Sequence, residues 1–457
     1  MTQPRVHGNQ TKTYTAKRLP RHNGLAAWRD ILPPLKAAAP LEQDITADFA
    51  VVGAGFAGLS AARRLGQLNP GAKIVVLEAG ALAEGAAGRN SGFMIDLPHD
   101  LASDDYAGQG EQGDREMIRL NRQAIDFARE AVAEYGINPA YFDPVGKVNG
   151  AASPAGVAHN AAYAGHLARL GEPAEVLDAR DMADMTGSSY YLSGLYTPGT
   201  VMLQPAGYIQ QLAQGVRQKA TIYENSPVTS FARLGPDWQI NCPQGKVTTP
   251  KIVLSVNGHL ESFGFVPGRL MHIFLFAAMT PDLDTAVLKT LGGRSRWGIT
   301  PADPMGTTLR RIDSAQGGNR IITRSCAIFA PDMQTSPREL ATAQKVLHRK
   351  FAARFPNLSG LKMDYSWAGH LCLSKNKVSV MRELEENVFA ACCQNGLGTT
   401  RGTLTGMGAA ELASGQTSDI TRAFATQAVP EKLPPQPFSS IGATAYLRWK
   451  EWRAGKE

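Results

Sequence analysis

The sequence predicts an α/β protein in which an open parallel sheet alternates along the chain with a second region built on an antiparallel sheet. Two observations support this fold class. A buried strand, a glycine-rich turn, a helix and a second strand follow one another between residues 48 and 77, which is the order of a βαβ unit. Short strand-like runs separated by turns recur between residues 271 and 329, as they do in antiparallel sheets.

Length and composition restrict the class of protein. The 457 residues exceed the size at which a single hydrophobic core stops growing, so two closely associated domains are expected. The net charge of +7 comes from basic residues spread along the chain, so nucleic acid is not an expected partner. The five cysteines lack CxxC spacing, which argues against a zinc site and a disulfide framework. Without a secretory signal or a bilayer-spanning apolar run, a cytoplasmic protein is expected.

The strongest local signal is a glycine-rich turn directly after the strand at residues 49–52. In such a motif the first glycine permits a tight turn, the second lets the backbone approach a pyrophosphate, and the third lets helix and strand pack. The unpaired N–H groups of the following helix favour the phosphate charge. The motif consists of Gly53, Ala54, Gly55, Phe56, Ala57 and Gly58.

An acid stands at the end of the next strand. Glu78 can accept hydrogen bonds from ribose hydroxyl groups, and an acid here disfavours the 2′-phosphate of NADP. A lone glycine motif is a weak signal, but here strand, turn, helix, strand and acid occur in register. The combination predicts dinucleotide binding, with Ala79 in the same site, and leaves NAD and FAD open.

Two later stretches of small residues also follow strands. A small-residue loop can line a flat ring system with its backbone, although it is also an ordinary surface connection. A glycine turn before a helix places a partial positive charge where an anion would be favoured, although it is also a plain strand-to-helix turn. The first stretch is Gly85, Ala86, Ala87, Gly88, Arg89, Asn90, Ser91 and Gly92, and the second is Gly396, Leu397, Gly398, Thr399 and Thr400.

Together the three stretches resemble the D-amino-acid-oxidase-like flavoproteins, which include glycine and sarcosine oxidases and the gamma-glutamylputrescine oxidase branch. The resemblance implies FAD on a Rossmann-like domain of the glutathione-reductase type, with an interleaved α+β substrate domain. It places the first stretch along the flavin and the second at the flavin's pyrimidine edge. The implied segments are an arm at 1–44, FAD-binding segments at 45–110, 220–262 and 366–415, substrate-domain segments at 111–219 and 263–365, and an extension at 416–457.

Weaker matches extend the expected cofactor site. Val228 resembles the family residue whose backbone meets the adenine, and Asn257 with Gly258 resembles the turn near the cofactor phosphates, although each is also an ordinary strand end. Cys372 lies near the place where some members attach the flavin through a cysteine thioether. A buried, inert thiol is the common alternative, so non-covalent FAD is expected and a link through Cys372 is kept open.

Three residues are candidates for the substrate side. His272 lies in a strand that passes close to flavin and substrate in the resembling family, and we expect it to tune substrate protonation unless it is a satisfied core histidine. Arg310 is a candidate anion clamp and Trp367 a candidate apolar wall.

The late glycine turn also departs from the family pattern. In sarcosine oxidases a lysine just after this turn helps to bind the substrate carboxylate, and Thr400 stands there in this chain. This departure favours an amine or a longer amino compound. A one-residue shift in the alignment would instead give the carboxylate role to Arg401.

The predicted function is FAD-dependent oxidation of a primary or secondary amine or an amino acid derivative. A neutral amine binds against the flavin, hydride passes from its α-carbon to the flavin N5, and the imine hydrolyses to an aldehyde or keto product. Oxygen or an acceptor then reoxidises the flavin. Two alternatives remain open, a flavin hydroxylase, which usually carries a Gly-Asp segment where this chain has residues 392–396, and a non-catalytic dinucleotide-binding module.

Overall fold

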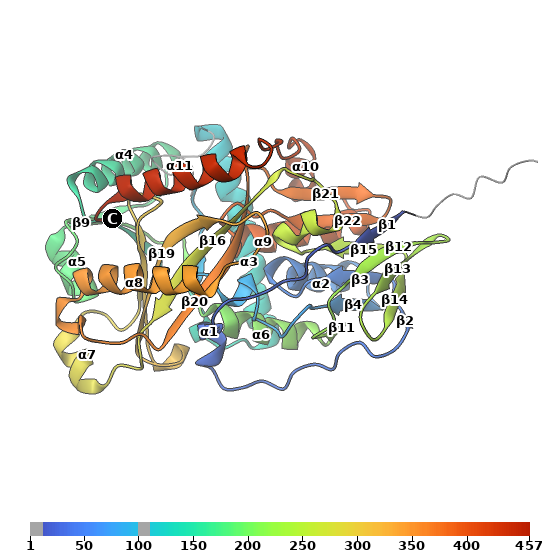
Figure 1. Cartoon of the computed structure of the whole chain (residues 1–457), viewed down its shortest axis with the longest axis horizontal. Coiled ribbons are helices and arrows are strands. Elements are labelled where there is room, and N and C mark those ends of the chain that lie inside the picture. The colour runs from blue at the N-terminus through green and yellow to red at the C-terminus, as the bar shows by residue number, and fades with distance from the viewer. Residues whose placement is uncertain (1–11, 99–109) are drawn as a thin grey trace, which may run out of the picture.

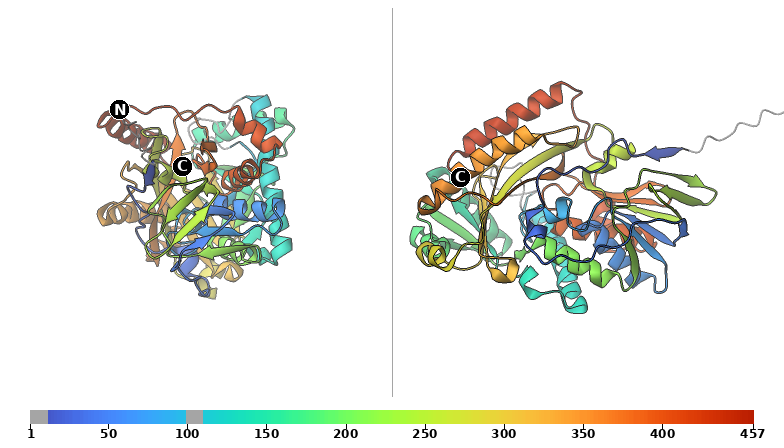
Figure 2. Two further views of the ribbon diagram at one scale, coloured as in Figure 1. Left: turned by 90° about the vertical axis from the view of Figure 1, so that its right-hand side faces the viewer. Right: turned by 60° about the horizontal axis from the view of Figure 1, so that its bottom comes forward.

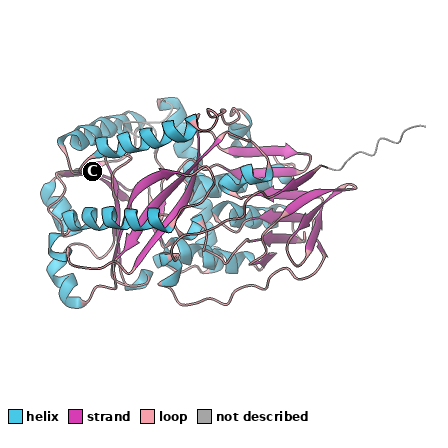
Figure 3. Cartoon of the chain, in the orientation of Figure 1, coloured by secondary structure: helices cyan, strands magenta, loops and turns pink. Residues whose placement is uncertain are grey.

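The computed structural model describes residues 12–98 and 110–457, and the strands of these residues form four sheets. Figure 1 shows the parallel sheet at one end of the molecule and the antiparallel sheet at the other. Helices pack against both sheets and also lie between them, as the colouring by secondary structure shows (Figure 3). The predicted α/β fold class is confirmed.

The parallel sheet carries the predicted βαβ unit at its centre. Its central strands read as nearly continuous apolar runs because both faces of the sheet are covered there, whereas the last edge strand is more polar and pairs antiparallel with its neighbour. β3 lies between the next strand of the chain and a strand that follows much later, so the strand order reverses at its carboxyl end. In spatial order the strands are β11 (Ala220–Tyr223), β4 (Ile74–Leu77), β3 (Phe49–Val52), β15 (Lys251–Leu254), β22 (Val388–Cys392) and β21 (Val380–Glu385).

The antiparallel sheet spans the other half of the molecule. Its neighbouring strands run antiparallel, apart from β17 and β7, which pair in parallel. Two ten-residue strands, β16 and β20, lie at the side facing the parallel sheet (Figure 1). In spatial order the strands are β20 (Tyr365–Ser374), β16 (Leu270–Met279), β19 (Arg320–Phe329), β18 (Thr308–Ile312), β17 (Trp297–Pro301), β7 (Lys147–Ala151), β9 (Ser193–Thr197) and β8 (Glu175–Leu177).

Two smaller sheets modify the predicted arrangement. Residues 238–240, within the predicted FAD-binding segment 220–262, lie in an edge sheet beside the parallel sheet, where β12 and β13 form a hairpin. The N-terminal arm contributes β1 to this edge sheet by pairing with β12, so the arm is anchored as a strand as well as by the buried Trp28. The edge sheet contains β1 (Thr13–Thr15), β12 (Ser230–Leu234), β13 (Asp237–Asn241), β14 (Lys246–Thr249) and β2 (Ile45–Thr46), and a further sheet contains β5 (Phe93–Met94), β10 (Val201–Leu203) and β6 (Phe142–Asp143).

The helices begin and end where local signals place them. α3 ends at Gly136, whose φ of 63° suits a left-handed cap. α8 begins with a capping box between Ser336 and Glu339. The helices are α1 (Ala27–Asp30), α2 (Phe56–Leu68), α3 (Glu111–Tyr135), α4 (Pro154–Leu170), α5 (Ala179–Thr186), α6 (Pro205–Val216), α7 (Thr285–Leu291), α8 (Pro337–Arg354), α9 (Thr400–Ala413), α10 (Asp419–Ala425) and α11 (Phe438–Ala454).

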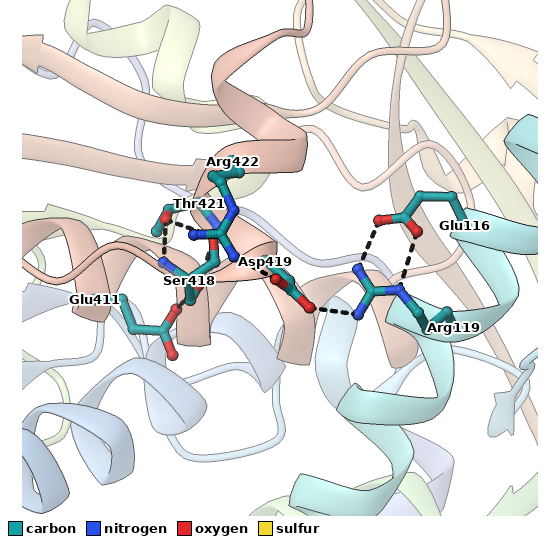
Figure 4. A network of polar contacts seen from close by, with 7 residues as sticks. All are labelled: Glu116, Arg119, Glu411, Ser418, Asp419, Thr421 and Arg422. Atoms are coloured by element: carbon teal, nitrogen blue, oxygen red, sulfur yellow. Dashed lines mark hydrogen bonds and ion pairs between the residues drawn. The ribbon is translucent and has the colours of Figure 1, made fainter.

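The C-terminal extension is held to the body by a polar network between α3 and α10. Arg119 lies 2.7 Å from both Glu116 on its own helix and Asp419 on α10, as Figure 4 shows. Asp419 also pairs with Arg422, and Ser418 donates a hydrogen bond to Glu411 of α9. These pairs are exposed, except for the buried Glu411, so they fix position more than they add stability.

α11 then crosses the outside of the antiparallel sheet, next to β19 (Figure 2). Across the two stretches that the structure describes, no helix has the length and apolar composition needed to cross a bilayer. Because the sheets are assembled from alternating segments of the chain, we keep the predicted interleaved domain boundaries as a proposal.

Candidate active site

A long cavity of about 270 Å³ opens at the carboxyl ends of the central parallel strands. Its floor is the backbone of the glycine-rich turn between β3 and α2, with residues 53–57 exposed to the cavity. Gly53 has a φ of 99°, and a Cβ on Gly58 would lie 1.8 Å from the Gly53 carbonyl oxygen. The turn therefore requires glycine at both places, and it leaves the first N–H groups of α2 facing the cavity.

Glu78 lies beside this turn at the end of β4. Its carboxylate accepts hydrogen bonds from the backbone N–H of Ala54 at 2.7 Å and from that of Gly80 at 3.3 Å. Burial raises the pKa of Glu78, while these backbone N–H groups act in the opposite direction. Glu78 and Ala79 both line the long cavity, in the position that a ribose-binding acid requires.

The small-residue loop continues the wall of the long cavity. Asn90 closes the loop on itself by donating from its side-chain amide to the Ala87 carbonyl at 2.6 Å and by accepting from the Gly92 N–H at 2.7 Å. Gly88 is pressed against the backbone, since a Cβ there would lie 1.9 Å from the Ala83 carbonyl oxygen. The loop is thus tightly packed, and it is not a flexible surface connection.

Arg89 fastens this loop to the N-terminal arm. Its guanidinium donates to the carbonyl groups of Glu84 at 2.6 Å and Gly24 at 2.9 Å. Burial lowers the pKa of Arg89 to about 10. Because the guanidinium is committed to backbone carbonyl groups, we assign it a structural part in the site.

A middle cavity of about 130 Å³ lies between the small-residue loop and the late glycine turn. Residues 89–93 line one side, and residues 396–399 line the other. The hydroxyl groups of Thr399 and Thr400 donate to the carbonyl groups of Phe93 at 2.6 Å and Ile95 at 2.9 Å. These bonds hold the N-terminus of α9 against the loop and leave the backbone of the turn to face the cavity.

The residues that matched the family's cofactor site more weakly do not all line the long cavity. Val228 and Asn257 line the long cavity, whereas Gly258 packs against the imidazoles of His272 and His370. Cys372 lines the long cavity, but its thiol is buried and its pKa is raised well above the usual value by a hydrogen bond with Cys393 and by burial. A protonated thiol is a poor nucleophile.

His272 lies behind the cavities. Its imidazole contacts a Glu261 carboxylate oxygen at 2.8 Å and the His370 imidazole at 3.2 Å. Of Glu261, His272 and His370, it is His370 that lines both the long and the middle cavity. Burial lowers the pKa of His370 well below its ordinary value, so this imidazole is neutral. No sequence signal pointed to His370, because strand parity alone does not reveal which side of β20 faces a cavity.

Arg310 and Trp367 lie elsewhere than predicted. Neither lines the long cavity, the middle cavity or the cavity beneath α11. The Arg310 guanidinium donates to the carbonyl groups of Ser91 and Leu203, and burial lowers its pKa to about 9. The Trp367 indole N–H donates to the Arg89 carbonyl at 3.0 Å. Both side chains hold the small-residue loop from behind, which is a positioning function.

An outer cavity of about 420 Å³ lies on the other side of the middle cavity, beneath α11. Alternate residues of two neighbouring strands form its apolar floor, since side chains at every second position share one face of a sheet. These residues are Met271, Ile273 and Leu275 of β16 and Leu371 and Leu373 of β20.

The charged residues that line the outer cavity are all basic. They are Arg324, Lys375, Lys377, Arg401 and Lys450. Among the residues the structure describes, no Asp, Glu or His lines this cavity. Arg324 also lines the middle cavity, so it stands at the junction of the two. The sequence did not indicate Arg324. It did indicate Arg401, as the residue that a one-residue alignment shift at the late glycine turn would assign to the substrate carboxylate.

The model of the family described as FAD dependent oxidoreductase matches residues 48–412, and the chain belongs to this family. It is therefore an FAD-dependent oxidoreductase. The residues present fit FAD: the glycine turn, the α2 N-terminus and Glu78 suit a dinucleotide, and the middle cavity suits a flat ring.

Two relatives are similar along most of the chain. Gamma-glutamylputrescine oxidoreductase of Escherichia coli is 24% identical over 419 residues, which are 89% of this chain and 93% of the relative. Probable oxidoreductase OrdL of Haemophilus influenzae is 24% identical over 388 residues, which are 81% of this chain and 84% of the relative.

Solved structures share the fold. Glycine oxidase of Geobacillus kaustophilus superposes with a TM-score of 0.66 at 15% identity, covering 82% of this chain and 96% of that one. L-amino acid deaminase of Proteus myxofaciens superposes with a TM-score of 0.64 at 14% identity, covering 91% of this chain and 97% of that one. Identity this low supports the fold alone.

Proposed function

We propose that this enzyme oxidises the carbon–nitrogen bond of an amine that also carries a carboxylate. The observation behind the proposal is the outer cavity, whose charged lining residues are all basic and whose floor is apolar. A carboxylate is favoured beside the guanidinium groups of Arg324 and Arg401, which can bind it in a bidentate manner. A polyamine with several positive charges would be repelled.

The apolar floor favours the reactive form of the amine. Burial against it disfavours the ammonium form, so it lowers the pKa of a bound amine. Bound FAD supplies the hydride-accepting ring for such a reaction. The chain's part is to hold the substrate by its carboxylate, to exclude water with the leucine and isoleucine floor, and to keep the amine neutral.

The product of this reaction is an imine, which hydrolyses to an aldehyde or keto compound, and oxygen or another acceptor takes the electrons. The names of the two sets of relatives agree with amine or amino acid substrates.

We also propose a cytoplasmic location, because the five cysteines are free thiols, as expected in a reducing compartment.

Arg401→Met tests the proposal directly. Loss of a charge-assisted contact to the carboxylate should raise KM for the best carboxylated amine at least about tenfold, while the flavin absorbance of the purified protein stays unchanged. The matched control is Arg180→Met on α5, where the guanidinium is exposed to solvent. A panel of amines with and without a carboxylate, added anaerobically, identifies the substrate class by bleaching of the flavin. Equal bleaching by uncharged and carboxylated amines would contradict the proposal.

A further inference from the structure

The outer face of α11 carries a continuous apolar stripe. The spacing of three, four, four and three residues from Phe438 through Ile441, Ala445 and Trp449 to Trp452 puts these side chains on one side of the helix. All five residues are exposed, with Trp452 78%, Phe438 69% and Ile441 65% exposed. An apolar stripe of this length on a surface helix marks a site of interaction.

The opposite side of the same helix is already in use. Ala443, Leu447 and Lys450 line the outer cavity, and Ala454 is buried. Phe438, at the start of the stripe, is exposed and also lines the outer cavity, so the stripe begins at the edge of this cavity. α11 is therefore apolar on two faces, one of which covers the outer cavity and the other of which is exposed. The helix itself lies at the outside of the molecule (Figure 2). A helix of this kind requires a second apolar environment.

The charged residues at the margins of the stripe are basic. Arg448 and Arg453 flank the stripe, and Lys456 follows its end, all three exposed. Arg453 lies over the Trp449 ring and 3.8 Å from Asp303, so its charge is partly offset.

The two acids of this segment are turned away from the stripe. Glu451 accepts from the Ala327 N–H at 2.7 Å, and Glu457 is buried against the Ala152 N–H at 3.0 Å. A tryptophan-rich stripe with basic margins matches the interface of an anionic bilayer, where indole rings lie at the headgroup level. The α11 stripe, defined as residues 438, 441, 445, 449 and 452, has the chemistry of a membrane-surface helix.

We propose that the α11 stripe docks this enzyme on an anionic membrane surface, with the helix lying in the plane of the interface. The absence of a spanning helix among the described residues agrees with attachment from one side. A second copy of the chain is a less favourable occupant, because it would bring together two positively charged surfaces of a protein whose net charge is +7. Docking would place the outer cavity, which α11 covers, close to the membrane.

Vesicle co-sedimentation of the full FAD-containing protein tests the proposal. We expect it to pellet with vesicles of phosphatidylcholine and phosphatidylglycerol, to pellet less with phosphatidylcholine alone, and to be released by added salt. The double variant Ile441→Glu with Trp452→Glu should reduce binding at least about tenfold. Leu234→Glu is the control, because this residue is also an exposed apolar side chain but lies on β12 in the edge sheet.

The other outcomes are equally informative. If the double variant fails to retain FAD, the single variant Trp452→Ser replaces it in the co-sedimentation assay. The proposal is wrong if the protein does not pellet with anionic vesicles, or if the α11 variants pellet as well as the control. It is also wrong if sedimentation equilibrium shows a dimer that the double variant separates, because the stripe would then be covered by a second copy.

Discussion

Gly58→Ala should damage both the folded protein and its hold on FAD. An ideal Cβ at this position would lie 1.8 Å from the Gly53 carbonyl oxygen and 2.6 Å from the Ser255 hydroxyl oxygen. The first of these atoms belongs to the backbone, so no rotation of a side chain relieves the clash. Either the turn or the first turn of α2 must move, and the N–H groups that face the long cavity move with it.

The expected size follows from the cost of overpacking. Inserting one methyl group into a tightly packed site costs about 1–3 kcal/mol. We therefore expect the apoprotein to lose about that much unfolding free energy in urea, measured from the midpoint at unchanged slope. Displaced N–H groups should weaken FAD binding by at least about tenfold, measured by titrating the apoprotein with FAD and following the flavin fluorescence.

Gly55→Ala is the matched comparison on the same turn. Here the nearest atom to the added Cβ is the Ala87 Cβ at 3.6 Å, an ordinary contact, and the remaining space is the long cavity itself. We expect the stability of the apoprotein to change by less than about 0.5 kcal/mol while FAD affinity falls. The reasoning is refuted if Gly58→Ala apoprotein unfolds at the same urea concentration as the parent, or if Gly55→Ala is the less stable of the two.

Three further predictions concern buried groups. Burial lowers the pKa of His259 to about 4, so the unfolded chain binds a proton at this residue at a higher pH than the folded protein does. This difference should lower the measured unfolding free energy by at most about 3 kcal/mol between pH 6.5 and pH 4. His259→Asn should make the decrease smaller. Burial lowers the pKa of Lys147 to about 8. Lys147→Met should therefore be more stable than the parent by about 3 kcal/mol at pH 7. Urea titrations at each pH should show this difference in unfolding free energy shrinking as the pH rises from 8 towards 10.5. Acid precipitation should release the yellow flavin into the supernatant, and the Cys372→Ser variant should still bind FAD. A yellow pellet from the parent and a colourless pellet from the variant would instead show a thioether link to Cys372.

Local patterns predicted a large part of the fold. The strands at 49–52 and 74–77, with the glycine turn and the helix between them, are properties of short segments, in which the period of the apolar residues and the need for glycine are visible directly. These motifs by themselves left NAD and FAD open. FAD was implied by the resemblance to the family, and both the family and the cofactor are confirmed.

The substrate side depends on long-range packing. Thr308 pairs with Arg324 across β18 and β19, and Arg310 lies two residues further along β18, so the two arginines share one face of the antiparallel sheet. The sequence did not reveal which of them lines a cavity, because the small-residue loop packs over Arg310 and leaves Arg324 at the cavities.

Taken alone, the sequence determined the βαβ unit, the dinucleotide motif with Glu78 and the interleaved order of helices and strands, because these features depend on neighbours in the chain. The tertiary structure alone decided the outer cavity, which joins β16, β19, β20, α9 and α11, and it alone showed the exposed stripe of α11. A helix that is apolar on two faces gives no clear periodic signal. Which face is buried is fixed only by long-range packing.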